Sequence, residues 1–417
     1  MVERGRGNLP AEFTSMIGHA AEVAEGLRAL ARTRLLAVTG PGGVGKSRVA
    51  VRVARHARRR FPGGTWYAEL SAVTGEPALT ARVAAAIGRP QARTAEGIAA
   101  ALRERRALVV LDTCEHLTGP VARLAEVLLR RAPHVKIVVT GRQPPDLAGQ
   151  RVLYVRPLQE ADAVTLFAER AAAVDPDFSL SGGGTRAAVA EICRSLDGLP
   201  LAIELAAACL RSLTAPELRD RLRDRCPLPA AGTTSTLPRQ RDLRATVEWS
   251  HALCGTEQRA LWAALSVVDG GFARDTAEAI GVEAGLPRVR VAAVLGDLVA
   301  GSVVLREPAG YRLLRPYRQV GLELLEARAR RRLTARYGAA TAAPVPAPGG
   351  GPEAGDVVLS PRELQVARLI TEGLTNLEIA GRLVISKRTV DAHVRNILAK
   401  GHLASRTHVA AWVASSD

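Results

Sequence analysis

Eight consecutive residues, Gly40 to Ser47, have the types and spacing of a phosphate-binding loop. They read G-P-G-G-V-G-K-S, which matches the pattern G-x-x-x-x-G-K-S. Glycines at these positions let backbone N–H groups converge on phosphate oxygens, and the start of a following helix adds its positive dipole end. The Lys46 ammonium would reach the β- and γ-phosphates, and the Ser47 hydroxyl would ligate Mg²⁺. The loop therefore predicts a site for ATP or ADP with Mg²⁺.

The residues on both sides of the loop support this interpretation. Arg34–Thr39 reads as a buried strand, and a helix is expected from about Arg48 to Arg60. The motif requires a strand, a loop and a helix in this order, and the alternative is a chance glycine-rich loop. The residues predicted to bind the nucleotide here are Gly40, Gly42, Gly43, Val44, Gly45, Lys46, Ser47 and Arg48.

A second candidate site residue ends the apolar stretch Ala107–Asp112. A carboxylate directly after a buried strand is the pattern of a Walker B motif, in which Asp112 would hold Mg²⁺ through water. The alternative is an aspartate that caps the following helix. Ser47 and Asp112 are therefore the predicted metal ligands. Glu115 and His116 lie close behind, where the simple expectation is that they cap a helix or face solvent.

The sequence of the C-terminal region predicts three helix starts. Ser360–Glu363 and Thr375–Glu378 both have the sequence of a capping box, and Ser386 opens a third helix after a short break. Two short helices joined by a tight turn, with the second polar and basic at its start, is the plan of a DNA-reading helix-turn-helix. The alternative is a small three-helix cluster that makes protein contacts.

The third of these helices separates an apolar stripe from polar side chains. Val390, Val394 and Ile397 recur at helical spacing and predict a packing face. Short polar and basic side chains on the other faces suit base edges and phosphates. The predicted DNA-binding residues are Thr375, Asn376, Ser386, Lys387, Arg388, Thr389, Asp391, His393, Arg395, Asn396 and Lys400.

Strand and helix signals place these motifs in separate domains. Further strands are expected at Thr65–Leu70, Lys136–Thr140 and Arg151–Val155, and their alternation with helices predicts a parallel sheet. Residues 160–225 have helical periodicity without strand signals. Two short strands about a Pro-Ala-Gly turn follow, at 302–305 and 311–314, and together with helices they predict a winged helix. A second DNA-binding module is the alternative for this last segment.

Bulk composition limits the class of protein. A chain of 417 residues predicts two to four domains, and its apolar content of 47% supports real cores. The net charge of +16 favours a polyanionic partner, although arginine-rich composition alone is the simpler account. Five widely spaced cysteines argue against a disulfide framework, and no apolar run is long enough to span a bilayer. We therefore expect a cytoplasmic protein without membrane contact.

Leu359 to Val413 resembles the C-terminal DNA-binding domain of LuxR-type transcriptional regulators. The resemblance is carried by S-K-R-T-V-D-A-H-V-R-N-I-L-A-K, from Ser386 to Lys400. It implies double-stranded promoter DNA as the partner, contact with RNA polymerase, and a homo-oligomer on the DNA.

Leu9 to Glu326 resembles the signal-transduction ATPases with numerous domains (STAND), specifically their NB-ARC-like group. The motifs that carry this resemblance are L-L-A-V-T-G-P-G-G-V-G-K-S, V-V-L-D-T-C-E-H-L, V-V-T-G-R-Q, L-D-G-L-P-L-A-I-E-L-A-A, L-R-A-T-V-E-W-S, G-G-F and Y-R-L-L-R-P-Y-R-Q. The resemblance implies that Arg142 senses the γ-phosphate, beside Asp112 as the second predicted catalytic residue, and that Pro200 packs on the adenine. The alternatives are a surface arginine and a proline that merely starts a helix.

Two positions depart from this family. His19 stands where an arginine is usual, and Thr113 stands where Asn or an acid usually follows the Walker B aspartate. The second departure leaves no strong catalytic base, so we expect tight nucleotide binding with slow, switch-type hydrolysis at most.

The sequence thus predicts a multidomain, nucleotide-gated transcriptional regulator of the LuxR type. The alternative is a DNA-localised P-loop ATPase or scaffold whose nucleotide site does not gate transcription. The predicted parts are an α/β P-loop NTPase domain (1–156), an all-α helical domain (157–232), a winged-helix domain (233–337), a Pro/Gly/Ala-rich linker (338–356) and a C-terminal all-α LuxR-type helix-turn-helix domain (357–417).

Overall fold

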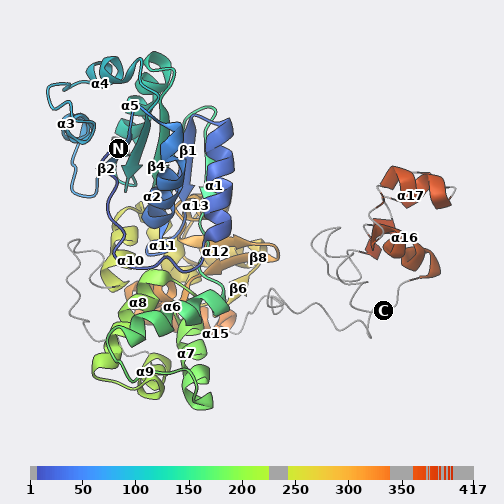
Figure 1. Cartoon of the computed structure of the whole chain (residues 1–417). Coiled ribbons are helices and arrows are strands. Elements are labelled where there is room, and N and C mark those ends of the chain that lie inside the picture. Colours follow the sequence, from blue (N-terminus) through green and yellow to red (C-terminus); the bar gives the residue numbers. More distant parts are fainter. Residues whose placement is uncertain are drawn as a thin grey trace. The chain divides into compact units, whose positions relative to one another are not determined.

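The computed structural model describes residues 7–224, 243–338 and most of 360–397 (Figure 1). The chain divides into two compact units, Met1–Ala342 and Ala343–Asp417, and the division falls within the stretch that the sequence predicted to be a linker. Each unit is described below by itself.

The first unit begins with a five-stranded parallel sheet in the order β2-β3-β4-β1-β5. Because the order places β1 between β4 and β5, the loop after β1 lies at the carboxyl edge, between the ends of these two strands. All five strands were expected from the sequence, and their ends differ by at most one residue. The strands are β1 (Leu35–Thr39), β2 (Thr65–Glu69), β3 (Leu108–Asp112), β4 (Lys136–Thr140) and β5 (Arg151–Tyr154).

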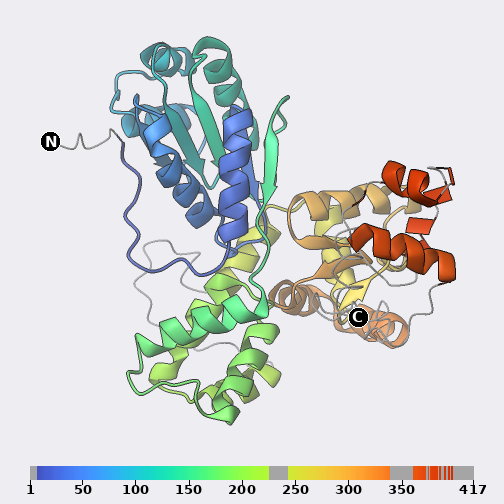
Figure 2. The ribbon, with the colours of Figure 1, turned by 45° about the vertical axis from the view of Figure 1, so that its right-hand side comes forward.

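Helices cover both faces of this sheet (Figures 1 and 2). Alternate strand residues point to opposite faces, so Leu36 and Val38 pack against α1 and α2, while Leu35 and Ala37 pack on the side of α3, α4 and α5. The three inner strands, β1, β3 and β4, read as near-continuous apolar runs for this reason. The helices are α1 (Ala20–Arg32), α2 (Lys46–Ala57) with the short η1 (Arg58–Arg60), α3 (Glu76–Ala86), α4 (Ala95–Leu102) and α5 (Thr118–Arg131).

A helical segment, residues 160–224, follows the sheet. Its described residues form helices and turns without a strand, as the sequence predicted. Thr214 and Glu217 cap the last of these helices reciprocally, so that α9 starts where its capping box is written. The helices are α6 (Glu160–Ala172), α7 (Gly183–Ser195), α8 (Pro200–Ala208), η2 (Cys209–Arg211) and α9 (Ala215–Arg223).

The remainder of the first unit, residues 243–338, is called the second lobe here. The expected hairpin is present as β7 (Val304–Glu307) and β8 (Gly310–Leu313), and β6 (Gly271–Phe272) adds a third antiparallel strand that the sequence analysis missed. Two residues carry too little alternation to be recognised as a strand. The helices are α10 (Leu243–Ala252), α11 (Thr256–Leu265), α12 (Arg274–Glu283), α13 (Arg288–Ala300), α14 (Arg315–Leu324) and α15 (Ala327–Tyr337).

The second unit contains α16 (Pro361–Thr371) and α17 (Asn376–Leu383), and the described residues between Thr389 and Ile397 are also helical. The predicted stripe is confirmed: Val390, Val394 and Ile397 are buried against the apolar residues of α16 and α17. Ser360 and Glu363 form the expected reciprocal cap of α16.

Candidate functional site

The phosphate-binding motif forms the connection between β1 and α2. Gly43 and Gly45 adopt φ values of +78° and +99°, which L side chains rarely adopt, so glycine is required at both positions. The Lys46 Nζ atom donates to the carbonyl oxygens of Gly40 (3.0 Å) and Pro41 (2.9 Å). The Lys46 side chain therefore folds back over the start of the loop. The loop stands between a strand and a helix, as the sequence predicted.

Asp112 ends β3 at the same edge of the sheet and is 3% exposed. Its carboxylate accepts hydrogen bonds from the Tyr67 hydroxyl (2.7 Å), from the Thr140 hydroxyl and from the Thr113 hydroxyl (3.4 Å). Three neutral donors hold the carboxylate, and among the described residues no cation pairs with it, which suits a carboxylate that is to face a metal ion. Burial raises the pKa of the neighbouring Cys114 thiol well above its usual value, so Cys114 is not a candidate nucleophile.

Arg142 follows β4 and is 5% exposed. Its guanidinium donates to the Ser250 hydroxyl and to the Thr246 carbonyl oxygen (3.1 Å), both on α10 of the second lobe. On the other side, its Nε atom lies 3.7 Å from a carboxylate oxygen of Glu115, whose side chain is 9% exposed. The predicted sensor arginine is therefore held between the sheet and the second lobe.

The second lobe also reaches the phosphate-binding loop directly. The Tyr317 hydroxyl on α14 accepts a hydrogen bond from the Gly42 N–H at 2.8 Å, and the same hydroxyl lies 3.4 Å from Arg142 Nη1. A Cβ atom added at Gly42 would lie 2.9 Å from both of these groups. The Tyr317 hydroxyl and the Arg142 guanidinium therefore fill the space beside the Gly42 amide, which leaves no room for a side chain at this position.

The helical segment meets the loop from another side. Pro200 is the first residue of α8, and the following Leu201 N–H donates to the Gly43 carbonyl oxygen at 3.1 Å. His19 lies opposite, 8% exposed, with its Nε2 atom 3.7 Å from the position of a Cβ atom on Gly45. The start of α8, with Pro200, therefore lies beside the loop, and contact of Pro200 with a base stays a prediction.

Arg48 and Val44 differ from their neighbours in the motif. The Arg48 guanidinium donates to Thr14, Ser15 and Glu204, away from the glycine-rich loop, so only its backbone remains available at the start of α2. Val44 is fully buried in the core, and its side chain packs the loop onto the sheet.

Several site residues were missed by the sequence analysis, and one expectation was wrong. Glu115 is buried beside Arg142 instead of facing solvent, because the turn after β3 folds back under the second lobe. Tyr317, Thr246 and Ser250 received no role, although Tyr317 lies in the motif Y-R-L-L-R-P-Y-R-Q. No local pattern distinguishes these residues, because their contacts with the loop are made across the tertiary fold.

The predicted DNA-binding residues are described in part. Ser386 caps the third helical stretch through the Thr389 N–H (3.1 Å), and Ser386, Thr389 and Asn396 are exposed while His393 is half-buried. Asn376 begins α17, but its side chain lies outside the described residues. Also outside them are Thr375, Lys387, Arg388, Asp391, Arg395 and Lys400.

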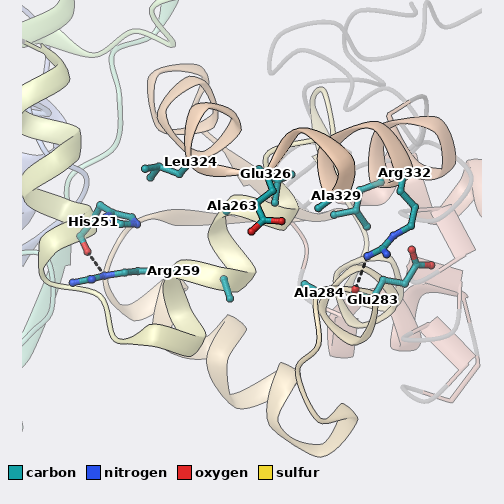
Figure 3. A pocket seen from close by; sticks show the side chains of 12 residues that line it. His251, Arg259, Ala263, Glu283, Ala284, Leu324, Glu326, Ala329 and Arg332 are labelled. Atoms are coloured by element: carbon teal, nitrogen blue, oxygen red, sulfur yellow. Dashed lines mark hydrogen bonds between the residues drawn. The ribbon is translucent and has the colours of Figure 1, made fainter.

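A cavity of about 410 Å³ lies apart from these residues, within the second lobe between α11, α12 and α15 (Figure 3). Both arginines that line it donate to backbone oxygens: Arg259 to the His251 carbonyl oxygen and Arg332 to the Glu283 carbonyl oxygen. These contacts hold neighbouring helices together, so the two guanidinium groups have structural roles. Within the described ranges, no cluster of metal-ligating side chains and no helix able to cross a membrane is found.

Comparison with known proteins agrees with this architecture. Residues 357–413 match the family of bacterial regulatory proteins called the luxR family. An uncharacterized protein of Mycobacterium tuberculosis is 37% identical over 322 residues, which are 75% of this chain and 82% of that protein. A second protein of that organism, provisionally named an HTH-type transcriptional regulator, is 38% identical over 304 residues, which are 71% of this chain but 34% of that protein.

The fold of the first unit also has a solved counterpart. The Walker-type ATPase of Pyrococcus abyssi superposes with a TM-score of 0.53 at 14% identity, and the match covers 76% of this chain and 99% of that one. At this level of identity the likeness concerns the fold alone. Taken together, these findings show that residues 357–413 form a DNA-binding domain of the luxR family, and that the first unit has the fold of a Walker-type ATPase.

Proposed function

We propose that the nucleotide state of the P-loop module gates this regulator, so that ATP and ADP differ in how the C-terminal helix-turn-helix is presented to promoter DNA. The observation that carries the proposal is the hydrogen bond from the Gly42 N–H to the Tyr317 hydroxyl. A backbone amide of a phosphate-binding loop is here occupied by a side chain of another lobe. A bound phosphate and the docked second lobe would therefore compete for the same hydrogen-bond donor, the Gly42 N–H.

The residues present fit a nucleotide with Mg²⁺. Lys46, the loop amides and the start of α2 would hold the phosphates, Ser47 and Asp112 would hold the metal, and Pro200 would meet the base. The bound group would supply a γ-phosphate charge in one state and lack it in the other. Hydrolysis is expected to be slow.

Arg142 and Gly42 would respond to that difference. With a γ-phosphate present, both could exchange Tyr317 and Ser250 for phosphate oxygens, which form stronger, charge-assisted hydrogen bonds. The second lobe would then lose two of the hydrogen bonds that connect it to the P-loop domain. Such a switch needs a difference in affinity between two states, and this exchange supplies one.

The finer organisation is part of the same proposal. We assign the P-loop NTPase domain to residues 1–156, the helical domain to 157–232, the winged helix to 233–337, the linker to 338–356 and the DNA-binding domain to 357–417. In this scheme the winged helix, with its three-stranded sheet, is a lever and not a DNA reader. A homo-oligomer on a two-fold site and contact with RNA polymerase complete the proposed assembly.

The test is duplex-DNA binding by the full chain, with selected sequences, in ADP or in a non-hydrolysable ATP analogue. We expect at least fivefold tighter specific binding with the analogue, and no difference in a Lys46→Ala protein, whose nucleotide binding is measured in parallel. Tyr317→Phe should raise DNA binding in ADP, whereas Tyr311→Phe, which alters a tyrosine of β8 away from the loop, should not. Equal binding in both states by a nucleotide-bound wild-type protein would reject the gating.

A slow ATPase that is localised on DNA is the second candidate. It is favoured by Glu115, because a buried carboxylate 3.7 Å from Arg142 is the nearest described candidate for a general base. On this proposal, Glu115→Gln should lower phosphate release about 10²-fold or more while leaving nucleotide binding intact. Wild-type protein that binds ATP without steady-state turnover would reject this candidate.

A further inference from the structure

The positive charge of this chain is gathered at the amino edge of the five-stranded sheet. Five segments meet there, because the amino ends of parallel strands lie at one edge together with the ends of the helices that precede them. We call them the basic edge, which consists of residues 28–34, 55–60, 103–106, 130–136 and 149–151. The edge lies at the opposite end of the strands from the phosphate-binding loop.

Hydrogen bonds between these segments show that they are adjacent. The Thr33 hydroxyl donates to the Gly149 carbonyl oxygen (3.1 Å), and the Arg34 guanidinium donates to that of Val135 (3.1 Å). Lys136 donates to Leu30, and burial together with the positive charges of Arg106, Arg34 and Arg60 lowers its pKa. Three of the five segments are thereby linked by hydrogen bonds, and residues 103–106 and 55–60 lie close enough for the charges of Arg106 and Arg60 to act on Lys136.

The charge balance of this edge differs from that of the rest of the chain. The five segments contain fourteen Arg and Lys against the single Glu104, a net charge of +13 out of the chain's +16. The other residues contain 43 Arg and Lys against 40 Asp and Glu, which leaves +3. Including Glu25 and Glu126, one turn away, still leaves +11 at the edge. An arginine-rich composition would spread its excess over the chain, so composition does not explain this distribution.

Most of these cations reach the surface, although Arg130 pairs with Glu126 (2.7 Å) and Arg55 donates to the Pro10 carbonyl oxygen (2.6 Å). Eleven of the fourteen are exposed, and the other three, Arg34, Arg105 and Lys136, are half-buried. Arg34 and Lys136 bond to helix-end carbonyl oxygens and have structural roles. Helix dipoles also favour cations at the ends of α1, α2, α4 and α5, and Arg103 is the C-cap of α4, but Arg105 and Arg106 belong to the loop that leads into β3. Helix capping therefore accounts for part of the edge only.

We propose that the basic edge is a second DNA-contacting surface, which binds the phosphate backbone of a duplex without reading its sequence. Duplex DNA carries one negative charge per about 1.7 Å of its axis, and arginine forks match phosphate oxygens. The helix-turn-helix belongs to the same chain and brings that polyanion to a high effective concentration. Because the edge lies opposite the loop that would hold nucleotide, this binding does not depend on the nucleotide state.

The test compares two matched variants of the full chain on a random-sequence duplex over a series of salt concentrations. The edge variant carries Arg59→Gln, Arg60→Gln, Arg103→Gln and Arg106→Gln. The control carries the same change at four exposed arginines outside the edge: Arg93, Arg186, Arg211 and Arg288. Each phosphate contact contributes about 0.9 to the slope of log K against log salt. We expect the edge variant to lose about two to four units of slope and the control to lose less than one.

Two further measurements keep the result interpretable. The half-variants Arg59→Gln/Arg60→Gln and Arg103→Gln/Arg106→Gln should each lose about half of the slope change, which a folding defect would not produce. Adding Lys46→Ala to both the wild-type and the edge proteins should leave the slope difference between them unchanged, so that failure of nucleotide gating and failure of this proposal are separable. Equal slopes for edge and control variants would overturn the proposal. So would an edge variant that loses binding to anionic lipid vesicles while keeping its binding to DNA.

Discussion

Tyr317 and Gly42 are separated by 275 residues in the sequence, yet the tyrosine hydroxyl accepts the glycine N–H at 2.8 Å. Trp262 supports this tyrosine from behind, through stacking at 5.7 Å between ring centroids and a bond from its indole N–H to the Tyr317 carbonyl oxygen. The hydroxyl is thus carried on a rigid part of the second lobe and not on a mobile chain end. The Tyr317 hydroxyl and a bound phosphate would therefore compete for the Gly42 N–H.

Tyr317→Phe should tighten binding of a non-hydrolysable ATP analogue. The change leaves the Gly42 N–H without its acceptor in the docked state, which costs about 1–3 kcal/mol for a buried donor. Since nucleotide no longer displaces that bond, affinity should rise about fivefold or more, and the melting temperature without nucleotide should fall. Titration with a fluorescent analogue measures the first effect. An affinity equal to that of Tyr311→Phe would show that the hydroxyl does not compete.

Gly43→Ala should weaken nucleotide binding and lower stability. Gly43 has φ +78°, and an added Cβ would lie 3.0 Å from Leu201 Cβ, whose backbone N–H bonds to this loop. Gly88→Ala is the matched control, since Gly88 has φ +69° and no atom within 4 Å of the added Cβ. The left-handed backbone costs both variants about 1–2 kcal/mol. Only Gly43→Ala should also lose nucleotide affinity; parallel urea melts and titrations that find equal losses would contradict this.

Asp197 links the helical segment to the second lobe, and its removal should change how stability depends on pH. The carboxylate, 8% exposed, accepts from Arg312 (2.7 Å) and from the Arg315 N–H. Burial raises its pKa above 3.8, although the Arg312 charge opposes this. The folded state therefore binds more protons than the unfolded state, and stability falls as pH rises from the unfolded pKa through the folded one.

Asp197→Asn abolishes that dependence because an amide does not titrate. The variant should gain stability relative to wild type as pH rises from about 4 toward 7, in urea unfolding at each pH. Asp177→Asn, on an exposed turn of the same segment, serves as the control. A constant difference between Asp197→Asn and wild type across this range would argue against the raised pKa.

Ile397→Ala should disable DNA binding without affecting nucleotide binding. Ile397 is fully buried in the small core of the second unit, and such truncations cost about 2–5 kcal/mol. A core this small cannot absorb that loss, whereas the first unit has its own cores. Gel-shift assays and nucleotide titration of the same protein separate the two activities. Loss of nucleotide affinity would show that the units do not fold independently.

The sequence by itself determined the local elements. The alternation of apolar strands with helices predicted all five strands of the sheet. Gly43 and Gly45 indicated a backbone conformation that glycine adopts readily and other residues rarely do. Capping residues such as Ser360 and Ser386 marked helix starts that the structure confirms. These features depend on neighbours within a few residues, which is why a linear pattern can reveal them.

Only the tertiary structure decided how the site is closed and where the charge lies. Tyr317 and Ser250 lie in motifs of the chain, but no spacing in the sequence shows that they contact Gly42 and Arg142; docking of the second lobe brings them together. Glu115 is buried for the same reason, against the expectation of solvent. The excess arginines appear dispersed in the sequence and gather only because a parallel sheet brings the amino ends of distant strands to one edge. Contacts between residues far apart in the chain are set by topology, which local spacing does not encode.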